Sequence, residues 1–567
     1  MKVKKMFNRL DKNYWYILGI VLFIILPQIS NNMILGNDLY YHISNLYAMN
    51  DNLSIKHFVL FPQKVLPVIA NNLGYGSGIF YPKLAHIILV YIYQVYEHLG
   101  ISNMMYTVKT FYFFIILLSG IFMYVYVKSA FGRKNMALLA SAFYITYPYF
   151  CVDLFYRNAL AECMMFVFIP IVFLGLHYLM ERDLKKFIIL FIIGFVGAVN
   201  SHLVLSVYLA GFVVIFALIN YKKIFTLDRI KVAIIACVFI LIFIFPFILP
   251  LLEHKIFGNY VVFEDGIMFS LETVNSSRRS LRNLFSYGNY NTLSYLAVIF
   301  SFLALINYKK TVFKDRKKIL IAFTLISCIC LLLTLNFIDW KWVPKFMLSI
   351  QFSWRLYLFF MFFISILGAS VIDLFKGEMQ KVIILFSIVL LLFNYNYVEN
   401  PKIYGRNLGY LHQNNIDISF WGAGWQSEYY PIASYRNKDY IDKLSDKSVS
   451  VKRGKCEISS VKSRTPYLEF DIKNNNTGCV VEVPRLYYLG YDIYINNKKI
   501  NYFENKNGLI EFKTSKGGKV KISYNGTILY KISLFIVWIT ILILIVYKVK
   551  IEGKKKNEKN INNNTNA

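Results

Sequence analysis

VAIIACVFILIFIFPFILPLL, residues 232–252, carries no charged side chain from its first position to its last. A helix of this length spans roughly 30 Å, the thickness of the hydrocarbon core of a bilayer. Similar runs occur at Trp15–Ile29 and Thr110–Tyr126. The whole chain is 57% hydrophobic and 17% charged, whereas soluble domains carry about 25% charged residues. The sequence therefore predicts a polytopic α-helical membrane protein.

The distribution of basic residues sets the expected topology. Lys and Arg outnumber Asp and Glu by 62 to 32, and the formal charge is +30. In a soluble protein this excess would suggest a nucleic-acid partner. Here the basic residues fall in short loops between apolar runs, such as KSAFGRK at 128–134 and YKKTVFKDRKK at 308–318. Cytoplasmic loops have this character, so we expect contact with membrane lipids, no nucleic acid, and both termini in the cytoplasm.

Keeping those basic loops on one side of the membrane gives about twelve transmembrane helices. They are expected at about 15–34, 105–127, 136–150, 162–180, 186–200, 202–220, 231–251, 293–307, 319–336, 355–373, 381–395 and 529–549. Residues 81–100 are apolar enough to be a thirteenth span, but counting them would move the later basic loops outside. We therefore interpret 81–100 as an amphipathic or re-entrant helix of the outer loop 35–104, with its polar side chains in water: Lys83, His86, Glu97 and His98.

The pattern changes after residue 395. Residues 396–528 show the alternation of apolar and polar residues that is typical of strands, for example in PYLEFDI and KVKISYN. We expect a transmembrane module at 1–395, an extracytoplasmic β-rich domain at 396–528, a final span at 529–549 and a disordered cytoplasmic tail at 550–567. Cys456 and Cys479 lie in the β-rich region and could pair in an oxidising compartment. No Cys or His spacing indicates a metal site.

The predicted topology collects several polar residues at the outer face. Asp38 and His42 follow the first span and share a face if the segment is helical. Arg157 and Glu162 follow the third span, with Arg157 in a turn and Glu162 at the start of the fourth. His202 lies in a tight turn, and Arg355 begins the tenth span. Each has a structural alternative: a helix-end acid, a snorkelling Arg, an acid favoured by the helix dipole, or a hairpin His.

The order of these motifs resembles a known family. GNDLYYHISNL at 36–46, GYGSGIFYPKLAHI at 74–87, YPYFCVDLFYRNALAE at 147–162, SWR at 353–355 and SEYYP at 427–431 resemble the bacterial YfhO-like membrane proteins. They are also similar to proteins labelled 6-pyruvoyl-tetrahydropterin synthase-related, and both groups are similar to GT-C glycosyltransferases. The resemblance extends over nearly the whole chain and rests on the order and spacing of the motifs.

The resemblance implies a GT-C-like fold in a bacterial plasma membrane. It also implies transfer of a sugar from a polyprenyl-phosphate donor to a cell-envelope glycan or polymer on the outer face. Asp38, His42 and Glu162 are then the catalytic candidates, and Arg157, His202 and Arg355 the substrate-binding ones. Many GT-C enzymes have two adjacent acidic residues, whereas Asn37 precedes Asp38 here. A divalent metal cofactor is left open, and no metal ligand is assigned.

Two other classes of function remain open at this stage. A transporter or flippase of lipid-linked glycan would also need many spans, with ionisable groups near the middle of the membrane. A non-catalytic envelope assembly factor would keep the fold and lose the chemistry. The sequence has no P-loop, GxGxxG, GxSxG or HExxH motif, which argues against ATP-driven transport, nucleotide-cofactor redox chemistry and zinc proteolysis.

The topology makes a direct prediction. Cysteines introduced singly at positions 38, 157 and 355 of a cysteine-depleted chain should react from outside intact cells with a membrane-impermeant maleimide. A cysteine at position 310, in a basic loop, should react only after permeabilisation. Labelling of 38, 157 and 355 from opposite sides would contradict a shared site.

Overall fold

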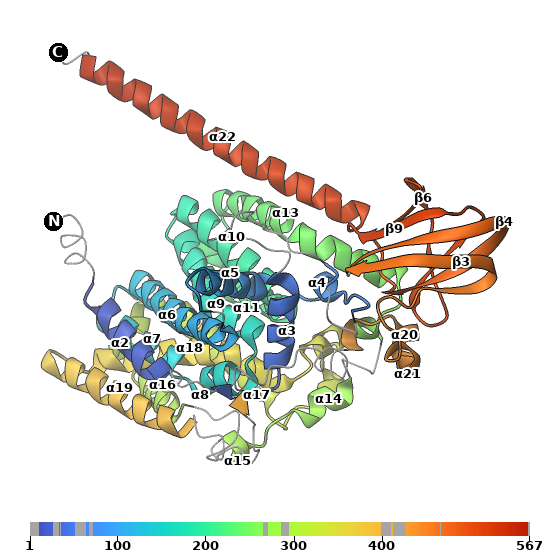
Figure 1. Ribbon diagram of the computed structural model, residues 1–567. Coiled ribbons are helices and arrows are strands. Elements are labelled where there is room, and N and C mark those ends of the chain that lie inside the picture. The colour runs from blue at the N-terminus through green and yellow to red at the C-terminus, as the bar shows by residue number, and fades with distance from the viewer. Residues whose placement is uncertain are drawn as a thin grey trace.

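The fold comes from a computed structural model, which describes residues 11–26, 33–34, 36–50, 64–66, 72–101, 103–264, 270–284, 294–398, 410–411, 427–464 and 466–564. Most of the described chain is helical, and a β domain, residues 427–527 as described, precedes the last helix (Figure 1). The expectation of strands before the last helix is therefore confirmed, although most of 396–426 lies outside the described residues.

Every expected span falls on a helix. In chain order these are α2 (Asn13–Ile25), α6 (Met104–Phe131), α7 (Lys134–Ile145), α9 (Leu160–Met180), α10 (Leu184–Ser201), α11 (Leu203–Ile219), α13 (Leu227–Phe257), α16 (Tyr295–Ile306), α17 (Lys317–Thr334), α18 (Tyr357–Ala369), α19 (Glu378–Val398) and α22 (Ile528–Asn564).

The count of twelve spans is not confirmed. Among the described residues, seven helices are long and apolar enough to cross a membrane. An eighth results if α7 is joined to the bent continuation Pro148–Arg157. Three further apolar helices, α2, α11 and α16, have only 13, 17 and 12 residues, which is short for a bilayer that needs about 20.

Two helices form the centre of the module. The apolar windows of Leu160–Met180 and Ser353–Leu374 are 89% and 94% buried within the protein, whereas those of Leu227–Phe257 and Ile528–Lys550 are 17% and 11% buried. A helix that is apolar all round and enclosed by protein belongs to the core, and one that exposes apolar side chains can face lipid. Glu162 and Arg355, near the starts of these two central segments, are therefore held by the most enclosed part of the fold.

Three short helices cover one end of this core: α3 (Leu39–Asn50), α4 (Ser77–Phe80) and α5 (Leu84–His98). α5 packs against both α3 and α6. Glu97 and His98 are exposed as expected, but Lys83 and His86 are only 6% and 0% exposed, so the prediction that they stay in water is wrong. The reason is that α3 covers this face of α5 and supplies polar partners for it.

The β domain is an antiparallel sheet. Its strands are β3 (Ser450–Arg464), β4 (Tyr467–Leu486), β5 (Tyr491–Ile495), β6 (Lys498–Ile500), β7 (Phe503–Glu504), β8 (Leu509–Thr514) and β9 (Gly518–Tyr524). The order is β6-β5-β9-β4-β8-β7, and β3 pairs with β4. Alternate residues such as Phe470, Ile472 and Val520 are buried, which explains the period-two pattern. A disulfide joins Cys456 on β3 to Cys479 on β4.

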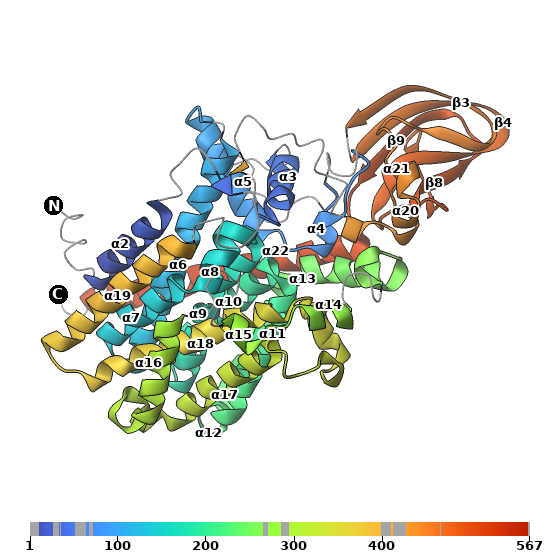
Figure 2. The same ribbon diagram turned by 90° about the horizontal axis from the view of Figure 1, so that it is seen from below.

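The last helix returns along the transmembrane module. α22 leaves the β domain beside α13, and its far end lies, like α2, at the end of the molecule farthest from the β domain (Figures 1 and 2). α22 continues to Asn564, through most of the range 550–567 expected to be a disordered tail. Lys and Glu in this range have high helix propensity, which accounts for the difference.

The disulfide should stabilise the β domain. It closes a loop with a sequence separation of 23, and a cross-link of that size contributes about 3 kcal/mol, mainly by restricting the unfolded chain. The double variant Cys456→Ser with Cys479→Ser should therefore lower the free energy of unfolding of the β domain, measured by pulse proteolysis of the full chain. Cys237→Ser, which removes an exposed free thiol, is the matched control. Equal stability of the two variants would contradict the prediction.

Candidate functional site

The segment that follows the first predicted span is attached to the turn between the third and fourth predicted spans. The Gly36 backbone N–H donates to Asn158 Oδ1 at 2.7 Å, and the Asp38 N–H donates to the Arg157 carbonyl at 2.9 Å. A Cβ added at Gly36 would lie 2.1 Å from Asn158 Oδ1 and 2.2 Å from the Tyr156 carbonyl. Only glycine lets the backbone at position 36 come this close to residues 156–158. This close contact fixes the position of Asp38, two residues later.

The turn itself depends on a π-helix and one left-handed residue. The π-helix η2 (Val152–Arg157) follows α8 (Pro148–Cys151) and ends at Asn158, which has φ 53°. Asn158 Nδ2 donates to Tyr112 Oη at 2.8 Å and to the Leu154 carbonyl at 3.0 Å. This break separates Arg157 from α9, as the sequence predicts, and lets Arg157 turn toward Glu162.

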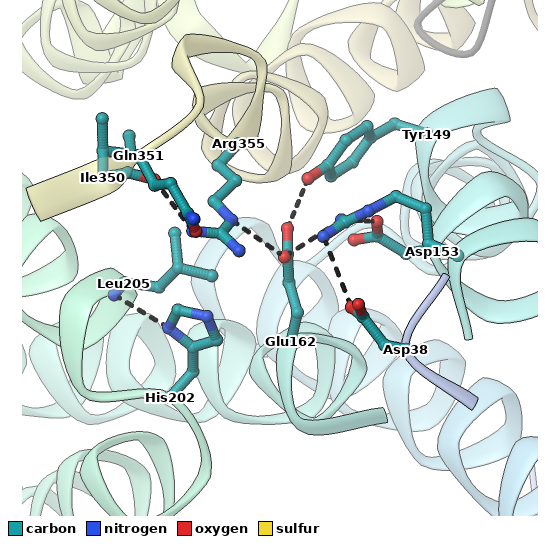
Figure 3. Close-up of polar contacts among 10 residues, drawn as sticks. Asp38, Tyr149, Asp153, Glu162, His202, Leu205, Ile350, Gln351 and Arg355 are labelled. Carbon is teal, nitrogen blue, oxygen red and sulfur yellow. Dashed lines mark hydrogen bonds and ion pairs between the residues drawn. The ribbon is translucent and has the colours of Figure 1, made fainter. Parts of the chain in front are cut away.

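Glu162 is the centre of an ion-pair cluster (Figure 3). Its Oε2 atom lies 3.0 Å from Arg157 Nη1 and 3.3 Å from Arg355 Nε, and its Oε1 accepts a hydrogen bond from the Tyr149 hydroxyl. Arg157 Nη1 also pairs with Asp153. The Glu162 and Asp153 side chains are 2% and 0% exposed, so these carboxylates and guanidiniums compensate one another inside the protein.

Asp38 stands at the open side of this cluster. Its Oδ2 atom lies 3.9 Å from Arg157 Nη2, and 43% of its side-chain surface is accessible to solvent. Enclosure by the surrounding protein raises the pKa of the Asp38 carboxyl, while Arg157 and then Arg355 lower it by a smaller amount. Asp38 is therefore an accessible carboxylate with an increased affinity for a proton, which suits a general base.

The segment that carries Arg355 is the short helix η8 (Ser353–Leu356). Arg355 Nη1 donates to the Ile350 carbonyl at 2.9 Å and to Gln351 Oε1 at 3.2 Å. Trp354 lies against the Arg157 guanidinium, whose Cζ is 4.3 Å from the ring centroid, a cation–π contact. The tryptophan thus helps to fix the position of Arg157.

His202 borders the cluster without joining it by a hydrogen bond among the described residues. It precedes α11, and its Nδ1 accepts a hydrogen bond from the Leu205 N–H at 3.3 Å (Figure 3). Burial lowers the pKa of His202 to about 3, and Arg355 contributes to the same shift. The imidazole is therefore neutral at physiological pH and positions a helix end next to the two arginines.

His42 lies in a different polar cluster. Its Nδ1 is 3.0 Å from His86 Nε2, and burial lowers the pKa of His42 to about 3. Nearby, Lys83 Nζ donates to Asn45 Oδ1 at 2.6 Å and to the Ser77 hydroxyl. The structure thus brings together Asp38, Arg157, Glu162 and Arg355, with His202 beside them, and pairs His42 with His86 on the neighbouring helices.

Sequence reasoning did not single out three members of the site as functional residues: Tyr149, Asp153 and Trp354. Asp153 is four residues before Arg157, a spacing that allows an ion pair on a helix. The sequence therefore contained a pattern from which this contact could have been predicted. Tyr149 and Trp354 had no comparable signal, because their roles depend on the turn at Asn158.

The donor set around Asp38 does not fit a divalent cation. In the part of the chain that the structure describes, no three His, Cys, Asp or Glu side chains lie close enough to hold a metal. Glu162 and Asp153 already accept ion pairs or hydrogen bonds from Arg157, Arg355 and Tyr149. Asp38 then remains as a single carboxylate, and we derive no chemical step through a metal.

No family model matches the chain. The chain is 23% identical over 626 aligned positions to an uncharacterized protein of Lactococcus lactis subsp. cremoris (strain MG1363), with 96% of this chain and 97% of that protein covered. Similar solved structures include arabinofuranosyltransferase AftD from Mycobacteria, with 12% identity and a TM-score of 0.43. That match covers 69% of this chain and only 27% of the mycobacterial protein. A mutant form of the same enzyme gives 11% identity, a TM-score of 0.41 and coverages of 68% and 28%.

Asn158 should be important for the stability of the site. Asn158→Ala removes the bonds to Gly36, Tyr112 and Leu154 and places a Cβ-bearing residue of lower left-handed preference at φ 53°. We expect a loss of about 2–4 kcal/mol in the free energy of unfolding, measured by denaturation in detergent. Asn158→Gly should lose about 1 kcal/mol less, because glycine adopts this conformation freely.

Asn200→Ala is the control for this pair of variants. Asn200 also lies near a helix end, and its side chain donates to the Val196 carbonyl. Its replacement should lower the free energy of unfolding by less than about 1 kcal/mol, which is roughly the contribution of one partly exposed hydrogen bond. Similar losses for Asn200→Ala and Asn158→Ala would show that the turn is not critical.

Proposed function

We propose that the protein is a membrane glycosyltransferase of the cell envelope, with its site on the outer face. The donor is a polyprenyl-phosphate sugar and the acceptor is an envelope glycan or polymer. The observation that carries the proposal is the accessible Asp38 carboxylate beside an otherwise closed cluster of Arg157, Glu162 and Arg355. The order of sequence motifs that resembles GT-C glycosyltransferases supports the same reaction class.

In this mechanism Asp38 removes the proton of the acceptor hydroxyl. The acceptor oxygen forms a bond to the anomeric carbon of the sugar as the bond from that carbon to the phosphate oxygen breaks. The phosphate leaves with the bonding electrons, and the proton remains on Asp38. A direct displacement of this kind inverts the anomeric centre. Because a phosphate is a good leaving group, it can depart without protonation by an acid. The step then needs a base to deprotonate the acceptor hydroxyl.

The arginines act through charge. The guanidinium edge of Arg157 that faces Asp38 is 3.9 Å from the carboxylate, so it can approach a phosphate placed on the same side. Arg355 adds positive potential from the far side of Glu162. Glu162 and Asp153 hold both groups in fixed positions, which is the preorganisation that stabilises charge as it develops on the leaving group. His42 and His202 serve as positioning residues in this proposal.

Replacing Asp38 by Asn tests the reaction. The variant keeps the shape of the side chain and removes the base, so product formation should fall by a factor of about 10²–10⁴. The measurement is the mass profile of envelope glycans from a deletion strain that expresses each variant at equal protein level. Glu97→Gln, which changes an exposed acid on α5, should restore the normal profile.

The same experiment separates the alternatives. A glycan profile that Asp38→Asn leaves intact would favour a non-catalytic assembly factor. Accumulation of an unchanged lipid-linked glycan on the inner leaflet would favour a flippase. Because base catalysis requires the ionised carboxylate, the wild-type rate should also fall as the pH drops through the raised pKa of Asp38.

A further inference from the structure

A segment at the start of the β domain reaches the site around Asp38. It consists of the short helix η12 (Ser427–Tyr429) with Tyr430 and Pro431. The Val261 N–H donates to the Tyr430 carbonyl at 3.1 Å, and the Ile432 N–H donates to the Asn259 carbonyl at 3.0 Å. These bonds attach the segment to the chain that follows α13, so its position does not depend on side-chain contacts alone.

Tyr429 fixes the segment from three directions. Its ring stacks on Phe80 of α4, with centroids 5.5 Å apart. Its carbonyl accepts a hydrogen bond from the Tyr488 hydroxyl of the β domain at 2.8 Å. Its own hydroxyl interacts with that of Tyr41 on α3, one turn beyond Asp38. The neighbouring residue Glu428 is therefore held between the β domain and α3.

The electrostatic neighbours of Glu428 locate its carboxyl group. Asp38 and Arg355 both act on it. It acts in turn on four tyrosines that line the same region: Tyr41, Tyr75, Tyr81 and Tyr429. Glu428 is half-buried, and within the described chain it has no ion pair of its own, in contrast to Glu162. An acid without a cationic partner that lies in a site beside another acid is a candidate for contact with a substrate.

The two acids, Asp38 and Glu428, do not favour the same protonation state. Burial raises the pKa of Glu428 to about 7, the charge of Asp38 raises it as well, and Arg355 opposes the shift. Arg157 and Arg355 both lower the pKa of Asp38 and so favour its ionised form. With one proton between them, the stable arrangement is an ionised Asp38 and a protonated Glu428. A protonated carboxyl can donate a hydrogen bond, as a hydroxyl does.

We propose that Glu428, supplied by the β domain, contacts the sugar acceptor opposite Asp38 and donates an O–H hydrogen bond to one of its hydroxyl oxygens. The proposal rests on the proposed transferase function and adds a substrate contact to it. Glu428 keeps its proton throughout, since the proton released by the attacking hydroxyl goes to Asp38. The site is then complete only when the segment Ser427–Pro431 is docked on α3 and α4.

Substitutions at Glu428 test the hydrogen bond in the transferase reaction. Membranes with Glu428→Gln should retain the rate at neutral pH within about threefold, because an amide N–H can replace the O–H donor. Glu428→Ala should lose about tenfold or more. The wild-type rate should fall as the pH rises through about 7 and Glu428 ionises, and Glu428→Gln should lack this alkaline fall. A wild-type rate for Glu428→Ala, or an unchanged alkaline fall for Glu428→Gln, would overturn the proposal.

Glu504 is the matched control. It lies on β7, and burial alone raises its pKa to about 7, so Glu504→Gln removes a similar carboxyl away from the site. Its pH profile should equal that of the wild type. If Glu428→Ala fails to fold, the pH–rate profile of Glu428→Gln still tests whether Glu428 donates the hydrogen bond.

A second measurement does not require turnover. Infrared difference spectra of the full chain in nanodiscs report protonated carboxyls and their titration. The Glu428 band, identified by its loss in Glu428→Gln, should shift to lower pH in Asp38→Asn, because removal of a neighbouring negative charge lowers the pKa. The Glu504 band should not move. No shift of the Glu428 band would refute the pairing of the two acids, whereas an active Asp38→Asn enzyme would refute the transferase function itself.

Discussion

Two guanidinium groups meet one buried carboxylate at Glu162, and the end of the helical module that carries Asp38 is organised around that contact. Arg157 ends the π-helix before α9, and Arg355 lies in η8, which leads directly into α18, so the ion pairs tie together the two most enclosed segments. Breaking such a pair from one side leaves an uncompensated charge, at a cost of about 3–5 kcal/mol. The contact also leaves Asp38 as the accessible carboxylate of the cluster, whereas Glu162 and Asp153 are buried against the arginines.

The transmembrane part of the fold could be predicted from sequence because apolar runs and basic loops are strong signals. Each expected span falls on a helix, although several helices are shorter than a bilayer requires. The grouping of Asp38, Arg157, Glu162 and Arg355 followed from topology, since all four were placed at one face. Their contacts did not follow, because residues 157 and 162 cannot pair along a regular helix, and nothing in the sequence announces a π-helix that ends at a left-handed Asn158.

The main errors of the sequence-based predictions concern which side chains around α3 and α5 are buried. Lys83 and His86 have a polar character that suits a wet helix face, and hydrophobic periodicity cannot reveal that α3 covers them. The same covering layer draws His42 toward His86. Glu428 illustrates a related limit: its motif was visible in the sequence, but the packing of Tyr429 against Phe80 and Tyr41, which determines where it lies, is a long-range feature.

The site gathers residues from positions 38, 153–162, 202, 355 and 428, so just over three quarters of the chain must be synthesised before its parts exist together. A ribosome releases the chain from the N-terminus, and the earlier helices enter the membrane well before the β domain emerges. During that interval Asp38 and Arg157 can already be in place while the Ser427–Pro431 segment is still missing. Under the proposed function, a nascent or truncated polypeptide without this segment lacks the Glu428 contact, and the full set of site residues exists only after the start of the β domain has been synthesised.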